Sequence, residues 1–387
     1  MKIKKLEAIP IKLQMKKPFV IANVTNYDMF YIIVRLETDQ GIVGYGEATP
    51  AWEVTGETCE SVIGFINLIT TGSLLGYTLI GMEIENLNQI TRIIEEISGT
   101  NKPQLIYGNT AAKAAIEQSI LDAYGKSVGK PIHKLLNAEK KPIPFTKNIS
   151  IFDVDTTLNE VKIGIEEGYK IIRLKVGIEK CFGFDDYQRD AEVIKESFQM
   201  IKKHRIKLVA DANQGFIDSE RTINFCKKIE GQLDWLEQPV LASDLTAFSE
   251  IKNKTSVPLM ADESIHSAAS LKILLELGRI DFINIKLMKT GGLIPALKLA
   301  ALAEENKIGF QIGSMLESSI GSAMGCQLYF LKSNAISTDL NSFDLLKTNI
   351  AEGILIKSNR LYLSDLPGSG VNLSEEYLSK LRNKNLS

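Results

Sequence analysis

The pattern of apolar and polar positions changes near residue 140, which separates two kinds of fold. Residues 1–50 alternate apolar and polar side chains in runs broken by a turn at 39–41, and such alternation is typical of antiparallel strands. Residues 57–138 repeat apolar positions at helical spacing instead. Residues 1–135 therefore predict an α+β domain.

Within the helical part, residues 109–129 predict the helix with the clearest ends. Alanine and isoleucine recur there at helical spacing. Asn109 or Thr110 is expected to cap the first turn, because short polar side chains satisfy the free backbone N–H groups there. Gly125 or Gly129 is expected to end the helix, because glycine tolerates the left-handed backbone found at helix ends.

From residue 143 onward, short apolar runs alternate with amphipathic runs. The apolar runs, in order, are IPFTKNIS, KIIRLKV, IKLVAD, LDWLE, VPLMAD, FINIKL, GFQIGS and AISTDL. Repeated strand–helix units imply a parallel sheet with right-handed crossovers, and eight strands predict a closed barrel. We therefore expect an α/β barrel domain at 140–341, a capping domain at 1–135, and a segment at 342–387 that returns to the capping domain.

Three acidic residues and a lysine close four of these apolar runs at almost constant spacing. The residues, separated by 26, 25 and 24 positions, are Asp211, Glu237, Asp262 and Lys286. A single Asp at a strand end is as often a helix N-cap as a functional group. Three acids in register on consecutive units indicate a site at the carboxyl ends of parallel strands instead. Three carboxylates there predict a hard divalent cation, Mg²⁺.

Basic residues lie at two of the predicted strand ends. Arg173 and Lys175 close the second strand, and because side chains alternate along a strand, both point to one face while Leu174 points to the other. The alternative is a solvated basic pair, but the end of a barrel strand favours a role in the site. Lys286 is expected to point into the barrel mouth, whereas Lys289 lies beyond it and is interpreted as structural.

These residues together predict proton transfer next to a carboxylate. A divalent cation held by three acids keeps positions for a substrate carboxylate, and it stabilises the enediolate formed when the α-proton leaves. A lysine beside other cations loses its proton more readily, so Lys175 next to Arg173 and the metal can act as a base. Because the second and sixth strands face each other across an eight-stranded ring, Lys175 and Lys286 flank one α-carbon. That geometry predicts a racemase or epimerase; with one active lysine, the same residues would serve a β-elimination or cycloisomerisation.

Composition narrows the range of partners. The chain has 387 residues, of which 44% are apolar and 24% charged, with a formal net charge of −2. No basic cluster indicates binding to nucleic acid or a membrane surface. The most apolar stretch, about 62–82, is interrupted by Thr, Gly and Ser and is too polar to span a membrane. We expect a small-molecule substrate that carries a carboxylate, and a homo-oligomer is compatible with the sequence.

Cysteine and histidine content predicts a cytoplasmic protein with little scope for histidine chemistry. The four cysteines have no metal-type spacing and follow no signal peptide, so they are interpreted as reduced thiols. They are Cys59, Cys181, Cys226 and Cys326. The three histidines are His133, His204 and His266.

Six motifs together closely resemble the enolase superfamily, and within it the muconate lactonizing enzyme subgroup, over essentially the whole chain. They are RLKVG at 173–177, DANQG at 211–215, EQP at 237–239, ADES at 261–264, NIKLMKTGG at 284–292 and GSMLESSIG at 313–321. The resemblance implies an α/β fold: a modified TIM barrel, (β/α)₇β, with an N-terminal α+β capping domain that the C-terminal segment completes. It also implies that Asp211, Glu237 and Asp262 bind Mg²⁺, and that Lys175 and Lys286 form the acid/base pair.

Within the subgroup, the chain looks most like the dipeptide epimerases. TGE at 55–57 and the MLESSIG stretch both fit that group. The resemblance implies that Ser314 and two residues at the eighth strand end bind the dipeptide, where the family has a pair of aspartates that hold its ammonium group. The matching positions are Asp339 and Asn341, so one carboxylate of the pair is an amide here.

Three further positions bear on the substrate. Arg173 stands where the family motif has a lysine, and an arginine can hold a carboxylate but does not share proton traffic. Val24 stands where members acting on Ala-Glu dipeptides carry an arginine, so an apolar or small second residue is expected. Asn148 falls at a substrate-contact position. The resemblance thus predicts a magnesium-dependent dipeptide epimerase, an isomerase that acts by 1,1-proton transfer through an enediolate.

Other functions stay open on the sequence. A muconate-type cycloisomerase, an N-acylamino acid racemase or an o-succinylbenzoate synthase needs no ammonium contact, so Asn341 is compatible with each. The mandelate racemase branch uses a histidine near the seventh strand end, and GFQIGSML at 309–316 contains none. A non-enzymatic binding protein fits the barrel architecture, but it has no need of three acids and two lysines.

Overall fold

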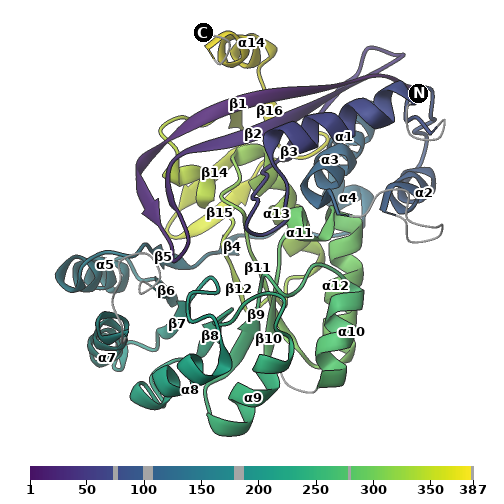
Figure 1. Ribbon diagram of the computed structural model, residues 1–387. Coiled ribbons are helices and arrows are strands. Elements are labelled where there is room, and N and C mark those ends of the chain that lie inside the picture. The colour runs from purple at the N-terminus through teal and green to yellow at the C-terminus, as the bar shows by residue number, and fades with distance from the viewer. Residues whose placement is uncertain (73–76, 99–107, 178–186, 278–279, 385–387) are drawn as a thin grey trace.

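A three-stranded antiparallel sheet forms the N-terminal part of the molecule, as the alternating pattern predicts. The computed structural model describes residues 1–72, 77–98, 108–177, 187–277 and 280–384. The strands lie side by side in the order β1 (Ile3–Val20), β2 (Thr25–Thr38) and β3 (Val43–Ala48). The turn predicted at 39–41 joins the last two. Figure 1 shows this sheet, in purple, above the barrel.

Four helices follow the sheet, in the segment that the helical spacing predicts. They are α1 (Cys59–Thr71), α2 (Leu87–Ser98), α3 (Thr110–Ser127) and α4 (Ile132–Leu135). Of the two glycines expected to end α3, Gly129 does so: the helix stops at Ser127, and Gly129 follows Val128 with a left-handed φ of +64°. Gly125 lies inside the helix. A Cβ atom at Gly125 would lie 2.6 Å from the Cα of Gly368, so this glycine permits a close approach of two backbones instead of ending the helix.

Eight parallel strands form the second sheet, and they follow one another in sequence order. They are β5 (Lys147–Ile149), β6 (Ile171–Lys175), β7 (Lys207–Asp211), β8 (Trp235–Glu237), β9 (Leu259–Ala261), β10 (Phe282–Ile285), β11 (Gly309–Ile312) and β12 (Ser337–Thr338). The sheet curls until its ends meet, where the backbone N–H of Thr146 donates to the carbonyl of Thr338 at 2.9 Å. The expected (β/α)₇β barrel is confirmed.

Helices cover the outside of the curled sheet, as Figure 1 shows. They are α5 (Val154–Glu166), α7 (Gln188–Ile201), α8 (Ser219–Lys228), α9 (Thr246–Lys254), α10 (Ala268–Leu277), α12 (Leu293–Glu305) and α13 (Ser319–Leu331). The short helix α11 (Leu287–Thr290) follows the end of β10 and packs against α3 of the cap (Figure 1). Inside the barrel, the buried side chains of Val209, Trp235 and Met260 form a small apolar cluster. Such inward layers fill a barrel, so functional groups are confined to its carboxyl end.

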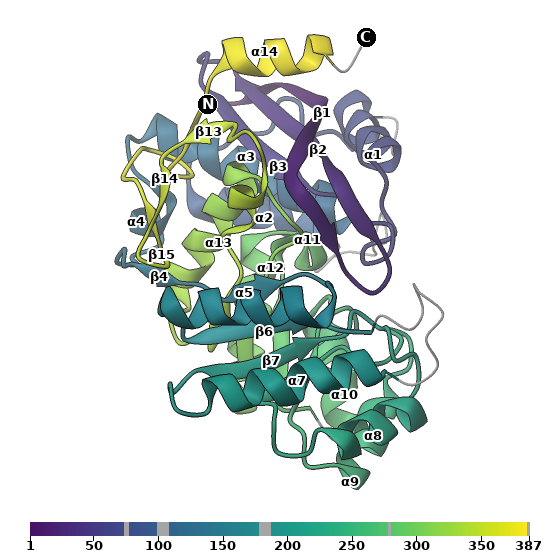
Figure 2. The same cartoon turned by 90° about the vertical axis from the view of Figure 1, so that its left-hand side faces the viewer.

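The C-terminal segment runs back along the first sheet. After the short helix η1 (Ser342–Leu345) come β13 (Ala351–Glu352), β14 (Ile354–Lys357), β15 (Arg360–Leu363), β16 (Asn372–Leu373) and α14 (Glu375–Lys384). Figure 2 shows α14, in yellow, lying over the first sheet, and Arg35 of β2 pairs with Glu375 at 2.7 Å. The division at 135, 140 and 341 stays a prediction, because β4 (Ile143–Pro144) pairs with β15 across it.

Two further findings bear on the sequence interpretation. Among the described residues, the cysteines at 59, 226 and 326 are free thiols, and Cys181 lies outside the described residues. None of the helices in the described ranges has the length and apolar character that crossing a membrane requires.

Candidate active site

A cavity of about 1020 Å³ lies between the capping sheet and the carboxyl ends of the barrel strands. Both predicted lysines and every predicted substrate contact line it. These residues are Val24, Asn148, Arg173, Lys175, Lys286, Ser314, Asp339 and Asn341. The predicted metal ligands lie among buried residues next to this lining, with 0 or 1% of their surface exposed. The structure thus brings together all the residues that the sequence singled out.

Strand register explains why the central charged groups meet. In the parallel ladder, Lys175 of β6 lies opposite Asp211 of β7, and Asp211 lies opposite Glu237 of β8. Residues at one level of adjacent parallel strands share a face of the sheet. Leu174 belongs to the hydrophobic core, whereas its neighbours Arg173 and Lys175 line the cavity. The alternation expected for this strand therefore holds.

Each of the two lysines forms an ion pair with one of the acids. The ammonium nitrogen of Lys175 lies 2.5 Å from Asp211 Oδ2 and 3.0 Å from Asn213 Oδ1. The nitrogen of Lys286 lies 2.6 Å from Asp262 Oδ2. Three strands separate β6 from β10 in either direction around the ring, so the lysines enter the cavity from opposite sides.

The third acid is held by an arginine and an amide. Glu237 accepts hydrogen bonds from Arg173 Nη1 at 2.8 Å and from Asn284 Nδ2 at 2.7 Å. Burial raises the pKa of Glu237 to about 8, and repulsion by Asp211 and Asp262 adds to the shift against the attraction of Arg173. Three carboxylates are therefore crowded in a buried part of the site.

The other two acids stay ionised because lysines outweigh their burial. Burial alone would raise the pKa of Asp262, but Lys286 and Lys289 hold it well below its usual value. Burial also acts on Asp211, and there Lys175 with Arg173 keeps the pKa lowered. The same attraction stabilises the charged form of Lys286. Burial lowers the pKa of this lysine, but the charges of Asp262 and Glu263 outweigh burial and raise it.

The arrangement fits a divalent cation by its donors, although the acids now face basic side chains. Within the described ranges, no group of three or more His, Cys, Asp or Glu residues is arranged to hold a metal ion. The fit rests on two observations. The donors are crowded carboxylate oxygens, which magnesium prefers, and Glu263 Oε2 beside them is buried without a hydrogen-bond partner. A bound cation would relieve both conditions.

Sequence reasoning missed three residues that support the site. Lys289, interpreted as structural, is fully buried and its nitrogen contacts Asp262 and the carbonyl of Asn284. Asn213 and Glu263 line the cavity and share a hydrogen bond of 3.3 Å. All three belong to motifs that follow a strand end, and this position in the sequence could have identified them as residues of the site. None of the three histidines is among the residues that line this cavity.

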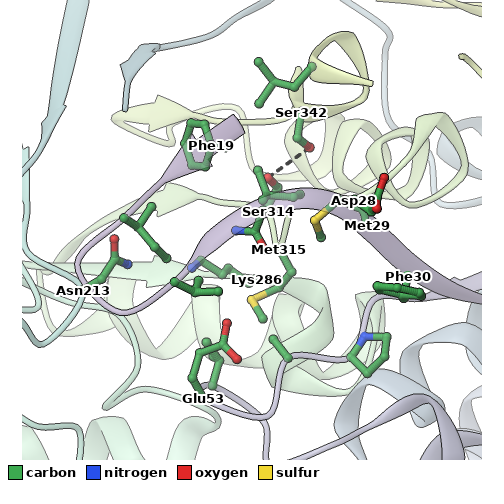
Figure 3. Close-up of a pocket in the computed structure, with 18 of the residues that line it drawn as sticks. Phe19, Asp28, Met29, Phe30, Glu53, Asn213, Lys286, Ser314, Met315 and Ser342 are labelled. Carbon is green, nitrogen blue, oxygen red and sulfur yellow. Dashed lines mark hydrogen bonds between the residues drawn. The ribbon is translucent and has the colours of Figure 1, made fainter. Parts of the chain in front are cut away.

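The loops above the site are fixed to the barrel. At the tip of the β1–β2 hairpin, Asn23 Nδ2 donates to the carbonyl of Asn213 at 2.6 Å. Glu57, in the TGE motif, accepts from the first backbone N–H groups of α3 at Ala111 and Ala112, at 2.8 and 3.1 Å. It therefore caps α3 from the loop that carries Glu53 into the cavity. Figure 3 shows Glu53 below Lys286 in this cavity.

The loop after β11 is held from two sides. Ser314 Oγ donates to Ser342 Oγ at 3.2 Å, which Figure 3 marks with a dashed line. From the capping sheet, Tyr31 donates to the carbonyl of Leu316 at 2.8 Å. Glu47 of β3 accepts from the backbone N–H of Ser318 at 2.9 Å, at the start of α13. The substrate-facing part of this loop is therefore positioned by the cap as well as by the barrel.

Two family models match the chain. The model described as Enolase C-terminal domain-like matches residues 157–377. The model of the mandelate racemase / muconate lactonizing enzyme N-terminal domain matches residues 5–137.

Curated relatives and solved structures match along nearly the whole chain. The N-succinyl-L-Arg/Lys racemase of Bacillus cereus is 34% identical over 98% of both chains, and its crystal structure superposes with a TM-score of 0.87. The L-Ala-D/L-Glu epimerase of Bacillus subtilis is 30% identical over 96% of this chain and 97% of the relative. A dipeptide epimerase from Cytophaga hutchinsonii, complexed with Mg and D-Ala-L-Val, is 26% identical with a TM-score of 0.84 over 98% of both chains.

Proposed function

The chain is an isomerase that belongs to the enolase superfamily, and from this premise we propose that it inverts an α-carbon by 1,1-proton transfer. The observation that carries the proposal is the placement of two lysines in one cavity. Lys175 ends the second barrel strand and Lys286 follows the sixth. One lysine removes a proton from one face of the α-carbon, and the other delivers a proton to the opposite face.

Asp211, Glu237 and Asp262 are the residues that would hold a magnesium ion. When bound, the ion supplies positive charge that stabilises the negative charge developing on the substrate carboxylate as the α-proton leaves. Support comes from the carboxylate donors, from the burial and the neighbouring acids that raise the pKa of Glu237 to about 8, and from the Mg in the Cytophaga relative.

The hydrogen bonds that each lysine makes to the protein orient its remaining N–H bonds toward the cavity. An ammonium group has three N–H bonds, and Lys175 spends two of them on Asp211 and Asn213. The third remains for the substrate. Lys286 is anchored by Asp262, and side chains of both lysines are at most one-tenth exposed. In each direction of the reaction one lysine is the neutral amine that takes the α-proton and the other is the ammonium that gives one, and few water molecules compete for either proton.

The substrate we propose is an N-acylated amino acid with a free α-carboxylate, a class that includes dipeptides and N-succinyl amino acids. The names of the two Bacillus relatives cover both kinds. Val24 lines the cavity with Phe19, Ile21 and Met29. This apolar wall supports the expectation of an apolar or small second residue, and we propose in addition that it packs the aliphatic part of a longer side chain on the reacting α-carbon.

Deuterium incorporation tests the proposal. Purified protein with Mg²⁺ in deuterated water should place a single deuterium at the α-position of L-Ala-L-Xaa or N-succinyl-L-Xaa substrates, read by mass spectrometry. Lys175→Ala and Lys286→Ala should each abolish inversion while keeping exchange on the enantiomer that faces the remaining lysine. Lys147→Ala is the matched control, because Lys147 lines the same cavity but pairs with Glu160 at 3.1 Å. Inversion that survives both active-site substitutions would exclude the mechanism.

A further inference from the structure

Arg173 joins three barrel strands across the floor of the cavity. Its Nε donates to Asn148 Oδ1 on β5 at 2.7 Å, and its Nη1 donates to Glu237 Oε2 on β8 at 2.8 Å. Its Nη2 contacts Asp339 Oδ2, directly after β12. A planar guanidinium presents donors in several fixed directions, which a lysine ammonium on a flexible stem cannot reproduce.

Asp339 is fully engaged by these neighbours. Only 3% of its surface is exposed. Its Oδ1 accepts from Asn148 Nδ2 at 3.3 Å, and its Oδ2 accepts from Gln311 Nε2 at 3.1 Å as well as from Arg173. Arg173 also pairs with Glu237, but Asp339 is the carboxylate that attracts it most strongly, so the charge of Asp339 already has a buried cationic partner within the protein.

Topology shows which part of the substrate meets this end of the cavity. An α-carbon between Lys175 and Lys286 has its carboxylate toward the acids on β7 to β9, because these strands fill one half of the ring. The other half, β11, β12 and β5, offers the hydrogen-bonding side chains of Ser314, Asn341 and Asn148. An amide-linked acyl group matches this polar half, and the side chain of the amino acid is left for the apolar wall of the cap.

We propose that the acyl group of the substrate carries no ammonium group, and that Arg173 sets this preference by neutralising Asp339. The inference rests on the proposed function and narrows its substrate class. A buried ammonium group needs a carboxylate partner that is free to pair with it. In the described half-ring of β11, β12 and β5, the carboxylate near the cavity is already paired, and Asn341 adds no charge.

A matched pair of substrates isolates this preference. L-alanyl-L-Xaa and N-propionyl-L-Xaa differ only in the ammonium group, so a comparison with the same Xaa cancels every other contact. In deuterated water at neutral pH, where most of the alanyl amine is protonated, we expect kcat/KM for α-deuterium incorporation to be at least about tenfold higher for the propionyl compound, equivalent to about 1.4 kcal/mol.

Two variants assign the preference to the residues named here. Arg173→Gln removes the cation that pairs with Asp339, and Asn341→Asp adds a carboxylate while keeping Arg173. Each variant should therefore shift the alanyl-to-propionyl ratio toward alanyl, whatever its effect on the overall rate. Circular dichroism confirms folding, and the ratio is internal to each variant. Faster wild-type exchange of the alanyl compound would overturn this inference and leave the proposed function intact. Exchange of neither compound, or of any other N-acyl amino acid, would overturn both.

Discussion

The floor of the cavity, formed by the carboxyl ends of the barrel strands, and its wall, formed by the capping domain, are built in opposite ways. On the floor, Arg173, Lys175 and Lys286 are each less than 10% exposed and each is ion-paired with an acid. On the wall contributed by the capping domain, Trp52 is 72% exposed, and Glu53 forms no ion pair within the described part of the chain. The floor holds its charges in fixed positions before any substrate arrives, whereas on the wall Glu53 keeps a carboxylate for a ligand, although Lys12 and Asp28 there pair with each other at 2.8 Å.

This difference separates chemistry from selectivity. Preorganised, buried charges suit a transition state, because they need no rearrangement as charge develops. They also make each substitution on the floor costly, since a buried charge that loses its partner is strongly destabilising. Residues of the wall such as Trp52, which is exposed, and Glu53, which is half-buried, touch solvent, so changing them alters contacts with the substrate and little else. If the two regions separate in this way, substitutions on the floor change rate and stability, whereas those on the wall change KM.

The largest effect is expected from removing the metal. Chelation with EDTA should lower the rate of α-deuterium incorporation by more than about 10³-fold, because a metal ion contributes several kcal/mol to stabilising charge in such reactions. Adding Mg²⁺ back should restore the rate. An exchange rate that is indifferent to EDTA would contradict the assignment of Asp211, Glu237 and Asp262.

Asp262→Asn should show, through the free energy of unfolding alone, how strongly the floor depends on its buried ion pairs. Without metal, the substitution leaves Lys286 and Lys289 buried beside a neutral amide, and we expect the free energy of unfolding to fall by about 3–5 kcal/mol. Denaturation in urea without Mg²⁺ gives the measurement. Glu53→Gln is the control from the wall and should change stability by less than about 0.5 kcal/mol. Equal losses in both variants would erase the distinction between the regions.

The contact between cap and barrel at Glu117 should make the stability of the protein depend on pH. This residue of α3 accepts from the backbone N–H groups of Leu293 and Ile294 at the start of α12, and burial raises its pKa to about 8. Between about pH 4.5 and 8, Glu117 is therefore protonated in the folded state and ionised in the unfolded state. Stability should fall as pH rises from about 4.5 to 8, by up to about 1.4 kcal/mol per pH unit from this group.

Glu117→Gln should remove that part of the slope, because the amide resembles the protonated acid and does not titrate. The measurement is urea denaturation at several pH values for both proteins. Other buried acids, such as Glu317, with a pKa of about 7, titrate in both, so only the difference between the two slopes is diagnostic. Parallel slopes would assign the pH dependence to those other groups.

The smallest effect is expected at the wall. Glu53→Gln should raise KM for substrates whose side chain is basic by about 1.4- to 5-fold, since an exposed ion pair contributes about 0.2–1 kcal/mol. The value of kcat should not change, because Glu53 is not paired with either lysine. A leucine-bearing substrate is the control. A large fall in kcat would mean that the wall takes part in the chemistry.

The barrel and the residues at its strand ends could be predicted because their signals are local. An apolar run that ends in a charged residue fixes both the strand and the end at which the side chain emerges, and this held for Lys175, Asp211 and Glu237. The helical segment of the cap was predictable for the same reason.

Features that depend on contacts between distant segments could not be predicted. Gly125 resembled a helix end until the structure placed Gly368 against it. Lys289 was read as structural because nothing in the sequence brings its nitrogen back to Asp262. Asp339 was treated as a carboxylate for a ligand, and only the assembled ring pairs it with Arg173.

Two acids of the capping domain have a consequence for engineering. Glu47 and Glu117 each supply the oxygens that begin a barrel helix, α13 and α12 respectively. Cap and barrel are therefore not exchangeable modules. A chimera that borrows the cap of a relative to gain a new selectivity must also carry both acids in the same positions, or N–H groups at the starts of α12 and α13 would lose their carboxylate partners.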